Sequence, residues 1–306
     1  MSAERQPAPL RSLLFVPGDS ARKQDKALGS AADALILDLE DSVATQNLPA
    51  ARTRVAQLLA ARPAGAGPEL WVRVNSPASG LLRADLEGVF DTRLPAGIVL
   101  PKIGAAGEII EVAAYLAALE TRLQAAPGST HLLVIATETP QGLLGLPQYP
   151  QALQGAPAAL TRLTGLTWGA EDLSAALGAL AKRDEGGGLT FTFQLARTMC
   201  LLSAAALGVQ AIDGVHTDFR DAAGLARELA SARRDGFTGK LAIHPEQVGA
   251  INAAFTPSEA EREHARRVVA AFAAEPGAGV ASLDGAMIDR PHLVQAQRIL
   301  AAGRRR

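Results

Sequence analysis

The sequence contains a single cysteine and few aromatic residues, which make up only 4% of its 306 positions. One cysteine cannot build a disulfide framework or a Cys-x-x-Cys metal site. Cys200 stands in the apolar run MCLLSAAALGV, and a lone thiol among leucine and alanine is typically a small core residue. The formal net charge is -1, so the charge balance gives no support for binding to nucleic acid or to an anionic membrane.

The chain also lacks long apolar runs and the common phosphate-binding loops. No apolar run is long enough to span a bilayer, and residues 1–11 contain no apolar stretch typical of a signal peptide. We therefore expect a cytoplasmic protein. No GxGxxG motif follows the first apolar run and no GxxxxGK[ST] loop occurs, which argues against a doubly wound nucleotide-binding fold.

What the sequence does contain is a regular alternation of short apolar runs and longer segments of helical composition. Apolar residues make up 48% of the chain, enough for a large core. Strand–helix units that recur over about 250 residues predict a TIM (β/α)8 barrel across residues 1–255, with an open doubly wound sheet as the alternative. The predicted strands lie at residues 12–18, 34–41, 70–75, 97–103, 131–138, 163–172, 211–218 and 240–247, and helices between them include 107–125, 195–208 and 222–236.

The pattern changes after residue 255. Residues 256–275 predict a helix with Thr256 or Ser258 as its N-cap, and a glycine-rich stretch and a last helix over 292–302 follow. We therefore expect residues 256–306 to form a C-terminal helical extension that packs on the barrel or on a neighbouring subunit.

Charged or titratable residues stand at the end of nearly every predicted strand. Active sites of (β/α)8 barrels lie at the carboxyl ends of the strands, so these residues predict one polar cluster on that face. Surface solvation explains a few of them but not their recurrence after buried apolar residues. The set includes Glu40, Asp41, Arg73, Lys102, Glu138, Asp172, His216 and His244.

Glu138 and Asp172 follow neighbouring strands and should lie close together. Two carboxylates that converge in a partly dry cleft need a cation or a shared proton. Mg2+, with Mn2+ as a possible substitute, suits two carboxylates completed by water and substrate oxygens. The alternative is that each carboxylate only caps the helix that follows it. Zinc is disfavoured, because His216 and His244 lack the close spacing of zinc ligands.

Arg73 and Lys102 are cations at the ends of apolar strands, and each requires an anion. Arg73 can bind a substrate carboxylate, stabilise an enolate or form a structural pair with Glu40 or Asp41. Lys102 can form a Schiff base or an ion pair, and no local feature indicates the lowered pKa that a Schiff-base lysine needs.

These residues stand in motifs that resemble one known family. The motifs are LFVPGD, ADALILDLEDSV, WVRVNSP, GIVLPKI, ATETPQG, TWGAEDL, AIDGVHTDFRD, AIHPEQV and GAMIDRP, in this order along nearly the whole chain. The sequence resembles the citrate lyase β-subunit-like (CitE-like) family of the HpcH/HpaI aldolase and malyl-CoA lyase superfamily. The resemblance implies a homotrimeric barrel and Mg2+-dependent cleavage or formation of a carbon–carbon bond. The substrates would be 3-hydroxyacyl-CoA thioesters such as citramalyl-, malyl- or citryl-CoA, and the products an acetyl thioester and an α-keto acid.

The resemblance also assigns roles by position. Glu138 and Asp172 match the metal ligands, and Glu138 also lies against the substrate. Arg73 matches the substrate-binding, catalytic arginine. Glu40 and Asp41 match acids that hold metal-bound water beyond the end of their strand, which leaves Asp38 to a structural hydrogen bond or ion pair.

Three further assignments by position concern the coenzyme and a neighbouring chain. Asp289 matches a catalytic aspartate that related lyases deliver from a neighbouring subunit. Arg22 and Lys23 fall near the positions that contact coenzyme A, although SARK departs from the usual spacing of the arginine.

The resemblance leaves several activities open. The chain can be a citrate lyase β subunit, active only in a multi-subunit complex on an acyl-carrier-protein thioester. It can also have a malyl-CoA thioesterase or malate synthase-like activity. A lysine-dependent aldolase that uses Lys102 is a further alternative, whereas a bare scaffolding role would not require acids at so many strand ends.

Overall fold

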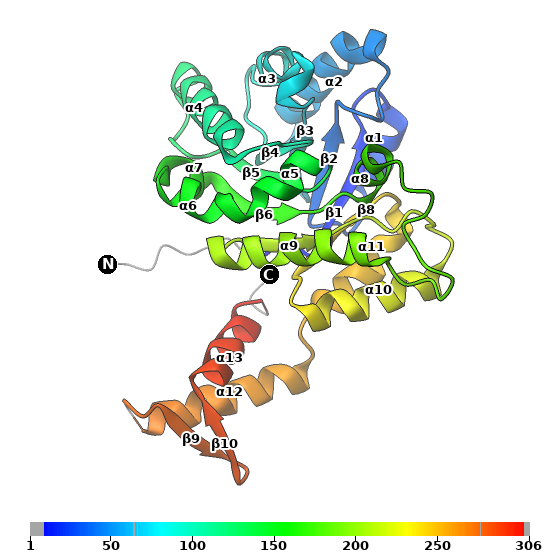
Figure 1. Cartoon of the computed structure of the whole chain (residues 1–306). Helices are drawn as coiled ribbons and strands as arrows, with labels where there is room; N and C mark the ends of the chain where they lie inside the picture. Colours follow the sequence, from blue (N-terminus) through cyan, green and yellow to red (C-terminus); the bar gives the residue numbers. More distant parts are fainter. Residues whose placement is uncertain (1–8, 64, 66, 276, 303–306) are drawn as a thin grey trace.

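A closed parallel barrel forms the main body of the chain (Figure 1). The computed structural model describes residues 9–302 except 64, 66 and 276. β1 pairs with β2 and also with β8, which closes the barrel and excludes the open-sheet alternative. The strands are β1 (Ser12–Pro17), β2 (Ala34–Asp38), β3 (Glu69–Arg73), β4 (Gly97–Leu100), β5 (His131–Ile135), β6 (Leu163–Thr167), β7 (Gln210–Asp213) and β8 (Gly239–Ala242).

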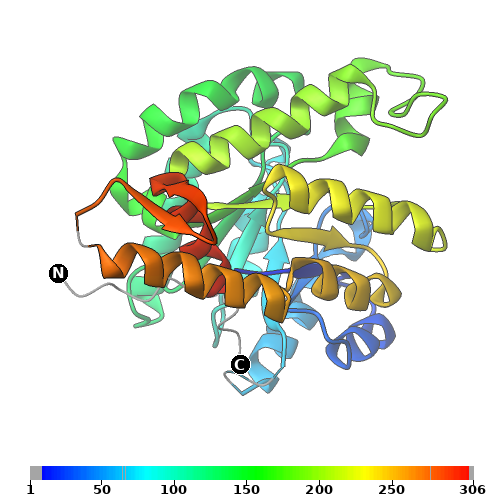
Figure 2. The same cartoon turned by 90° about the horizontal axis from the view of Figure 1, so that it is seen from below.

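Helices surround this barrel, as Figure 2 shows from below. The strands are apolar on consecutive positions because their two faces are both covered. One face fills the barrel interior with side chains such as Ile36, Trp71 and Leu133, and the other packs against the helices. The helices are α1 (Ala21–Leu28), α2 (Leu48–Ala61), α3 (Leu82–Val89), α4 (Ala106–Arg122), α5 (Pro140–Gly145), α6 (Tyr149–Gln154), α7 (Pro157–Arg162), α8 (Ala170–Leu177), α9 (Phe191–Leu207), α10 (Ala222–Asp235) and α11 (Pro245–Phe255).

The strands end earlier than the apolar runs that predict them. β2 ends at Asp38, so Glu40 and Asp41 lie beyond the strand, as predicted. β6 ends at Thr167, so the prediction of a strand through residue 172 is wrong at its carboxyl end. Asp172 instead lies in the first turn of α8. Glu40, Asp41 and Asp172 therefore lie beyond the strands at the carboxyl face of the barrel, and Arg73 is the last residue of β3.

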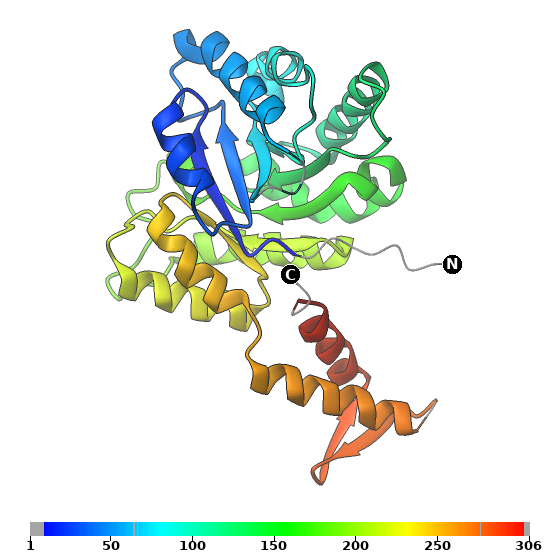
Figure 3. The ribbon, with the colours of Figure 1, turned by 180° about the vertical axis from the view of Figure 1, so that it is seen from behind.

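The segment after α11 stands apart from the barrel (Figure 3). It consists of α12 (Glu259–Ala274), an antiparallel hairpin of β9 (Val280–Leu283) and β10 (Ala286–Asp289), and α13 (Arg290–Ala302). Ser258 is the N-cap of α12, which decides between the two candidates. The extension has a small apolar core of its own, which includes Val268, Phe272 and Ile288. The two helices predicted for the extension are present, and the glycine-rich stretch between them forms a hairpin.

Among residues 9–302, apart from the three omitted positions, no helix is both long and apolar enough to cross a membrane. Most of the N-terminal segment tested for a signal peptide, residues 1–8, lies outside the described residues.

Candidate active site

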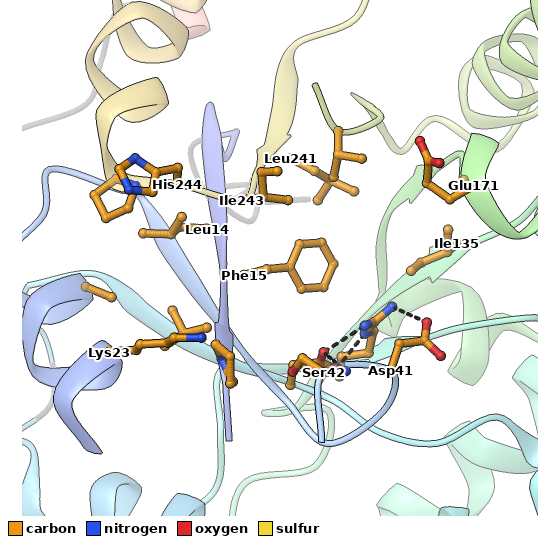
Figure 4. Close-up of a pocket in the computed structure, with 18 of the residues that line it drawn as sticks. Leu14, Phe15, Lys23, Asp41, Ser42, Ile135, Glu171, Leu241, Ile243 and His244 are labelled. Carbon is orange, nitrogen blue, oxygen red and sulfur yellow. Dashed lines mark hydrogen bonds and ion pairs between the residues drawn. The ribbon is translucent and has the colours of Figure 1, made fainter. Parts of the chain in front are cut away.

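A cavity of about 740 Å³ opens at the carboxyl ends of the barrel strands. Figure 4 shows the Phe15 ring in the middle of this cavity, with Lys23 and His244 on one side and Asp41 and Glu171 on the other. One part of the wall is apolar and another is densely charged. The lining includes Leu14, Phe15, Ile135, Val215, Leu241 and Ile243 among the apolar residues, and Arg22, Lys23, Lys26, Asp38, Asp41, Arg73, Glu138 and Asp172 among the charged ones.

Arg73 and Asp38 form a buried, two-pronged ion pair at the floor of the charged part. Arg73 Nε and Nη2 donate to the two carboxylate oxygens of Asp38 at 2.6 and 2.7 Å. The pairing register of β2 and β3 sets the two residues directly opposite each other. Burial alone would raise the pKa of Asp38, but the Arg73 guanidinium outweighs burial and holds this pKa below its usual range.

Asp38 also holds the loop that carries the next two acids. Its oxygens accept hydrogen bonds from the backbone N–H groups of Glu40 and Ser42. Arg73 Nη1 lies 2.9 Å from Glu40 Oε2, as an ion pair without hydrogen-bond alignment, and 3.5 Å from Asp41 Oδ2. Arg73 therefore pairs with Glu40 and Asp41 as one alternative expected, but its main partner is Asp38. This confirms the structural ion pair expected of Asp38, whose partner the sequence did not indicate.

Lys102 links the remaining acids. Its ammonium group lies 2.6 Å from Glu40 Oε1, 3.1 Å from Asp41 Oδ1 and 3.2 Å from Asp172 Oδ1. Burial would lower the pKa of Lys102, but the contacts with Glu40 and then Asp41 outweigh burial and raise it. A Schiff-base lysine needs a neutral amine, so these contacts disfavour the lysine-dependent aldolase.

Glu138 is the most deeply buried of the four acids around Lys102, with 3% of the residue exposed. Its Oε2 accepts a hydrogen bond of 2.6 Å from the backbone N–H of Lys102. Burial, with the nearby charges of Glu40 and Asp172, raises the pKa of Glu138 to about 8. Gly169 makes room for this side chain, because a Cβ there would lie only 2.6 Å from Glu138 Cγ.

The cluster carries more negative than positive charge. Fully ionised, Asp38, Glu40, Asp41, Glu138 and Asp172 bring five negative charges, whereas Arg73 and Lys102 bring two positive ones, which leaves an excess of three. Burial and then Asp41 raise the pKa of Glu40 to about 7 against the effects of Arg73 and Lys102, as expected where cations are too few.

This donor set fits a hard divalent cation. In the described part of the chain, no group of three or more His, Cys, Asp or Glu side chains is arranged as a ready metal site. Mg2+ does not require one, because it is commonly held by one or two carboxylates and completes its shell with water and substrate oxygens. Glu138 and Asp172 can supply those carboxylates.

The other predicted residues lie in different places. Arg22 and Lys23 project from α1 into the cavity lining. His244 is the N-cap of α11, and its ring stacks on Phe219 with centroids 4.4 Å apart. His216 contacts Glu228 rather than the acid cluster.

Asp289 lies in β10, at the end of the extension, and does not line the cavity of its own chain. Its carboxylate Oδ1 lies 2.5 Å from His292 Nδ1. Within one chain, the structure thus brings together every predicted acid of the cluster except Asp289.

Sequence reasoning missed a second buried charge network behind the cavity wall. Trp168 lines the cavity and donates from its indole nitrogen to Asp213 at 2.7 Å. Asp213 also pairs with Lys240 and Arg197, and Lys240 pairs with Glu228. The lysine that opens the run KLAIHPEQ was the available signal, because a lysine inside a strand that is covered on both faces needs a buried partner.

Comparison with known proteins assigns the chain to a family. Residues 11–245 match the family model described as HpcH/HpaI aldolase/citrate lyase. The chain belongs to this family. Its membership, with relatives that are named as lyases, confirms the predicted resemblance and the predicted enzyme class, a carbon–carbon lyase.

Curated relatives in the HpcH/HpaI aldolase/citrate lyase family carry three different names. A (3S)-malyl-CoA thioesterase of Cereibacter sphaeroides is 38% identical over 298 residues, which cover 97% of this chain and 95% of the relative. Citramalyl-CoA lyase, mitochondrial, of Rattus norvegicus is 36% identical over 297 residues, which cover 95% of this chain and 85% of the relative. Citrate lyase subunit beta of Escherichia coli is 36% identical over 301 residues, which cover 97% of this chain and 94% of the relative.

A solved structure is similar over nearly the whole chain. Protein CitE from Mycobacterium tuberculosis, in complex with magnesium, acetoacetate and coenzyme A, is 32% identical, with a TM-score of 0.74. The match covers 97% of this chain and 99% of that one.

Proposed function

We propose that the protein is a Mg2+-dependent lyase that cleaves, or in reverse forms, the carbon–carbon bond of a 3-hydroxyacyl-CoA thioester. The observation that carries the proposal is a partly buried cluster at the cavity in which five carboxyl groups face only two cations. Similarity to CitE, whose structure holds magnesium, acetoacetate and coenzyme A, supports the same cofactor and substrate class. Citramalyl-CoA and malyl-CoA are the thioesters that the relatives' names suggest first.

Each residue of the cluster has a role in this proposal. Glu138 and Asp172 would hold Mg2+, for which Mn2+ can substitute, and Glu40 and Asp41 would hold its water. When bound, Mg2+ supplies Lewis-acid polarisation of the keto-acid oxygens. Arg73 lines the cavity and would place positive charge near the enolate of the acetyl thioester.

The cavity rim offers a place for the anionic part of coenzyme A. Arg22, Lys23 and Lys26 of α1 line the cavity, and Figure 4 shows Lys23 on the side away from Asp41. Cations grouped on one helix at a cavity mouth suit phosphate groups.

We keep the cytoplasm as the expected location of the protein in the cell.

Cleavage requires proton transfers, for which Asp289 of a neighbouring chain is the proposed group. A base takes the proton of the 3-hydroxyl group, the C2–C3 bond breaks, and the keto acid leaves. The bonding electrons form the thioester enolate, which gains a proton at C2 to give the acetyl thioester.

A panel of CoA thioesters tests the proposal. With Mg2+ or Mn2+, malyl-, citramalyl- or citryl-CoA should release a keto acid, and EDTA should reduce the rate by at least about a hundredfold. Full activity in EDTA would contradict the metal role. Inertness toward all CoA thioesters, with activity on a citryl-acyl-carrier protein, would favour the citrate lyase subunit instead.

Mixing two inactive variants tests whether Asp289 acts between chains of a homotrimer. Glu138→Gln and Asp289→Asn should each be inactive alone. When the two are co-expressed, some sites pair an intact Glu138 from one chain with an intact Asp289 from another, so activity should return to a measurable fraction of wild type. No recovery in mixed trimers, verified by mass spectrometry, would place both residues in one chain's site or exclude Asp289.

A further inference from the structure

Lys102 contacts every acid around the proposed metal position. Its ammonium group reaches Glu40, Asp41 and Asp172 within 3.2 Å, and its backbone N–H holds Glu138 at 2.6 Å. Arg73 pairs with Asp38, Glu40 and Asp41, whereas among the described residues Lys102 is the cation that also pairs with Asp172.

The backbone at Lys102 is unusual. Its φ is +53°, in the left-handed region that residues other than glycine rarely adopt. Lys102 lies two residues after the end of β4, and its backbone N–H contacts Glu138 while its side chain contacts Glu40. A conformation that costs free energy persists where its surroundings hold it in place, and such residues cluster at functional sites.

We propose that Lys102 is a positioning residue that acts as the resident counter-ion of the acid cluster and sets its affinity for divalent cations. This inference rests on the proposed function. The ammonium group holds Glu40, Asp41 and Asp172 together by charge. A divalent ion at Glu138 and Asp172 has to share the Asp172 carboxylate with the Lys102 ammonium group and is repelled by that positive charge. Lys102 thus weakens cation binding relative to the same acids alone, and so keeps the metal exchangeable.

Metal affinity measured without substrate tests the inference. Mn2+ would be titrated into the metal-free full chain and followed by the electron paramagnetic resonance signal of free Mn2+, with Mg2+ as competitor. Lys102→Met should bind Mn2+ at least about tenfold more tightly than wild type, because a neighbouring like charge is gone. Lys102→Arg, which keeps the charge, should bind within about threefold of wild type.

Three further variants keep the test decisive. Lys102→Gln serves if the methionine variant does not fold by circular dichroism, and it should also bind more tightly. Arg227→Met removes an exposed cation of α10 that does not line the cavity and should leave Mn2+ affinity unchanged. Glu138→Gln should weaken binding at least about tenfold.

The outcomes separate the inference from the proposed function. If wild type binds Mn2+ and Lys102→Met or Lys102→Gln binds it with equal or lower affinity, the inference is overturned and the proposed function is not. No Mn2+ binding by wild type or by any Lys102 variant would overturn the proposed metal site together with the inference.

Discussion

Replacing Arg73 with methionine should lower the free energy of unfolding by roughly 3–5 kcal/mol, because it leaves Asp38 as an unpaired buried charge. Asp38 is 2% exposed, and both of its oxygens bind Arg73. The same change should free the loop that carries Glu40 and Asp41, so the remaining folded protein should lose at least about a hundredfold in kcat.

Urea denaturation followed by circular dichroism measures this loss. Arg83→Met is the matched control, because Arg83 is exposed and pairs with Glu87 within one helix. That variant should change stability by no more than about 0.5 kcal/mol. In the double variant with Asp38→Asn, the loss should be smaller than the sum of the single losses. A stability for Arg73→Met within about 1 kcal/mol of wild type would show that the buried pair is not as important as its geometry indicates.

Glu138→Gln should have opposite effects on activity and on stability. The variant should lose at least about a thousandfold in kcat, because a neutral amide is a poor ligand for Mg2+. The metal-free variant should nevertheless be more stable than wild type near pH 8, by roughly 1–3 kcal/mol. The glutamine removes a carboxylate that burial and then Glu40 and Asp172 disfavour, while its oxygen can still accept the N–H of Lys102.

The free energy of unfolding of the metal-free wild type should fall as the pH rises, for the same reason. Folding raises the pKa of Glu138 from 4.5 to about 8, so its stabilising contribution is complete below pH 4.5 and is lost as the pH rises toward 8. Urea denaturation of the metal-free wild type between these pH values should show the free energy of unfolding fall as the pH rises. In Glu138→Gln, the contribution of Glu138 to this fall should be absent. Glu111→Gln, on the exposed face of α4, is the control and should match wild type in kcat and in pH dependence. A Glu138→Gln variant that keeps wild-type kcat would contradict the role of this carboxylate.

The barrel could be predicted from the sequence because a parallel strand buried on both faces leaves a short, continuous apolar run. The runs misplace the carboxyl ends, because residues such as Trp168 are apolar yet belong to the loop. The hairpin in the extension was missed, although Asp284 and Gly285 form a recognisable signal for a tight turn between short strands.

The charged residues of the site could also be predicted, but their partners could not. Sequence spacing suggested Glu40 or Asp41 as the partner of Arg73, whereas the register of β2 and β3 selects Asp38. That register depends on the packing of the whole barrel, which a single sequence does not reveal. The link from the backbone of Lys102 to Glu138 depends in turn on a left-handed conformation that no residue type signals.

A metal ion held by Glu138 and Asp172 should support cleavage of a carbon–carbon bond rather than of the thioester. The most direct test quantifies three products in one sample of purified protein with citramalyl-CoA or malyl-CoA: keto acid, acetyl-CoA and free CoA thiol. We predict one keto acid for each acetyl-CoA and no free thiol, with turnover that stops in EDTA and returns with Mg2+. Free thiol without keto acid, or undiminished turnover in EDTA, would contradict the claim.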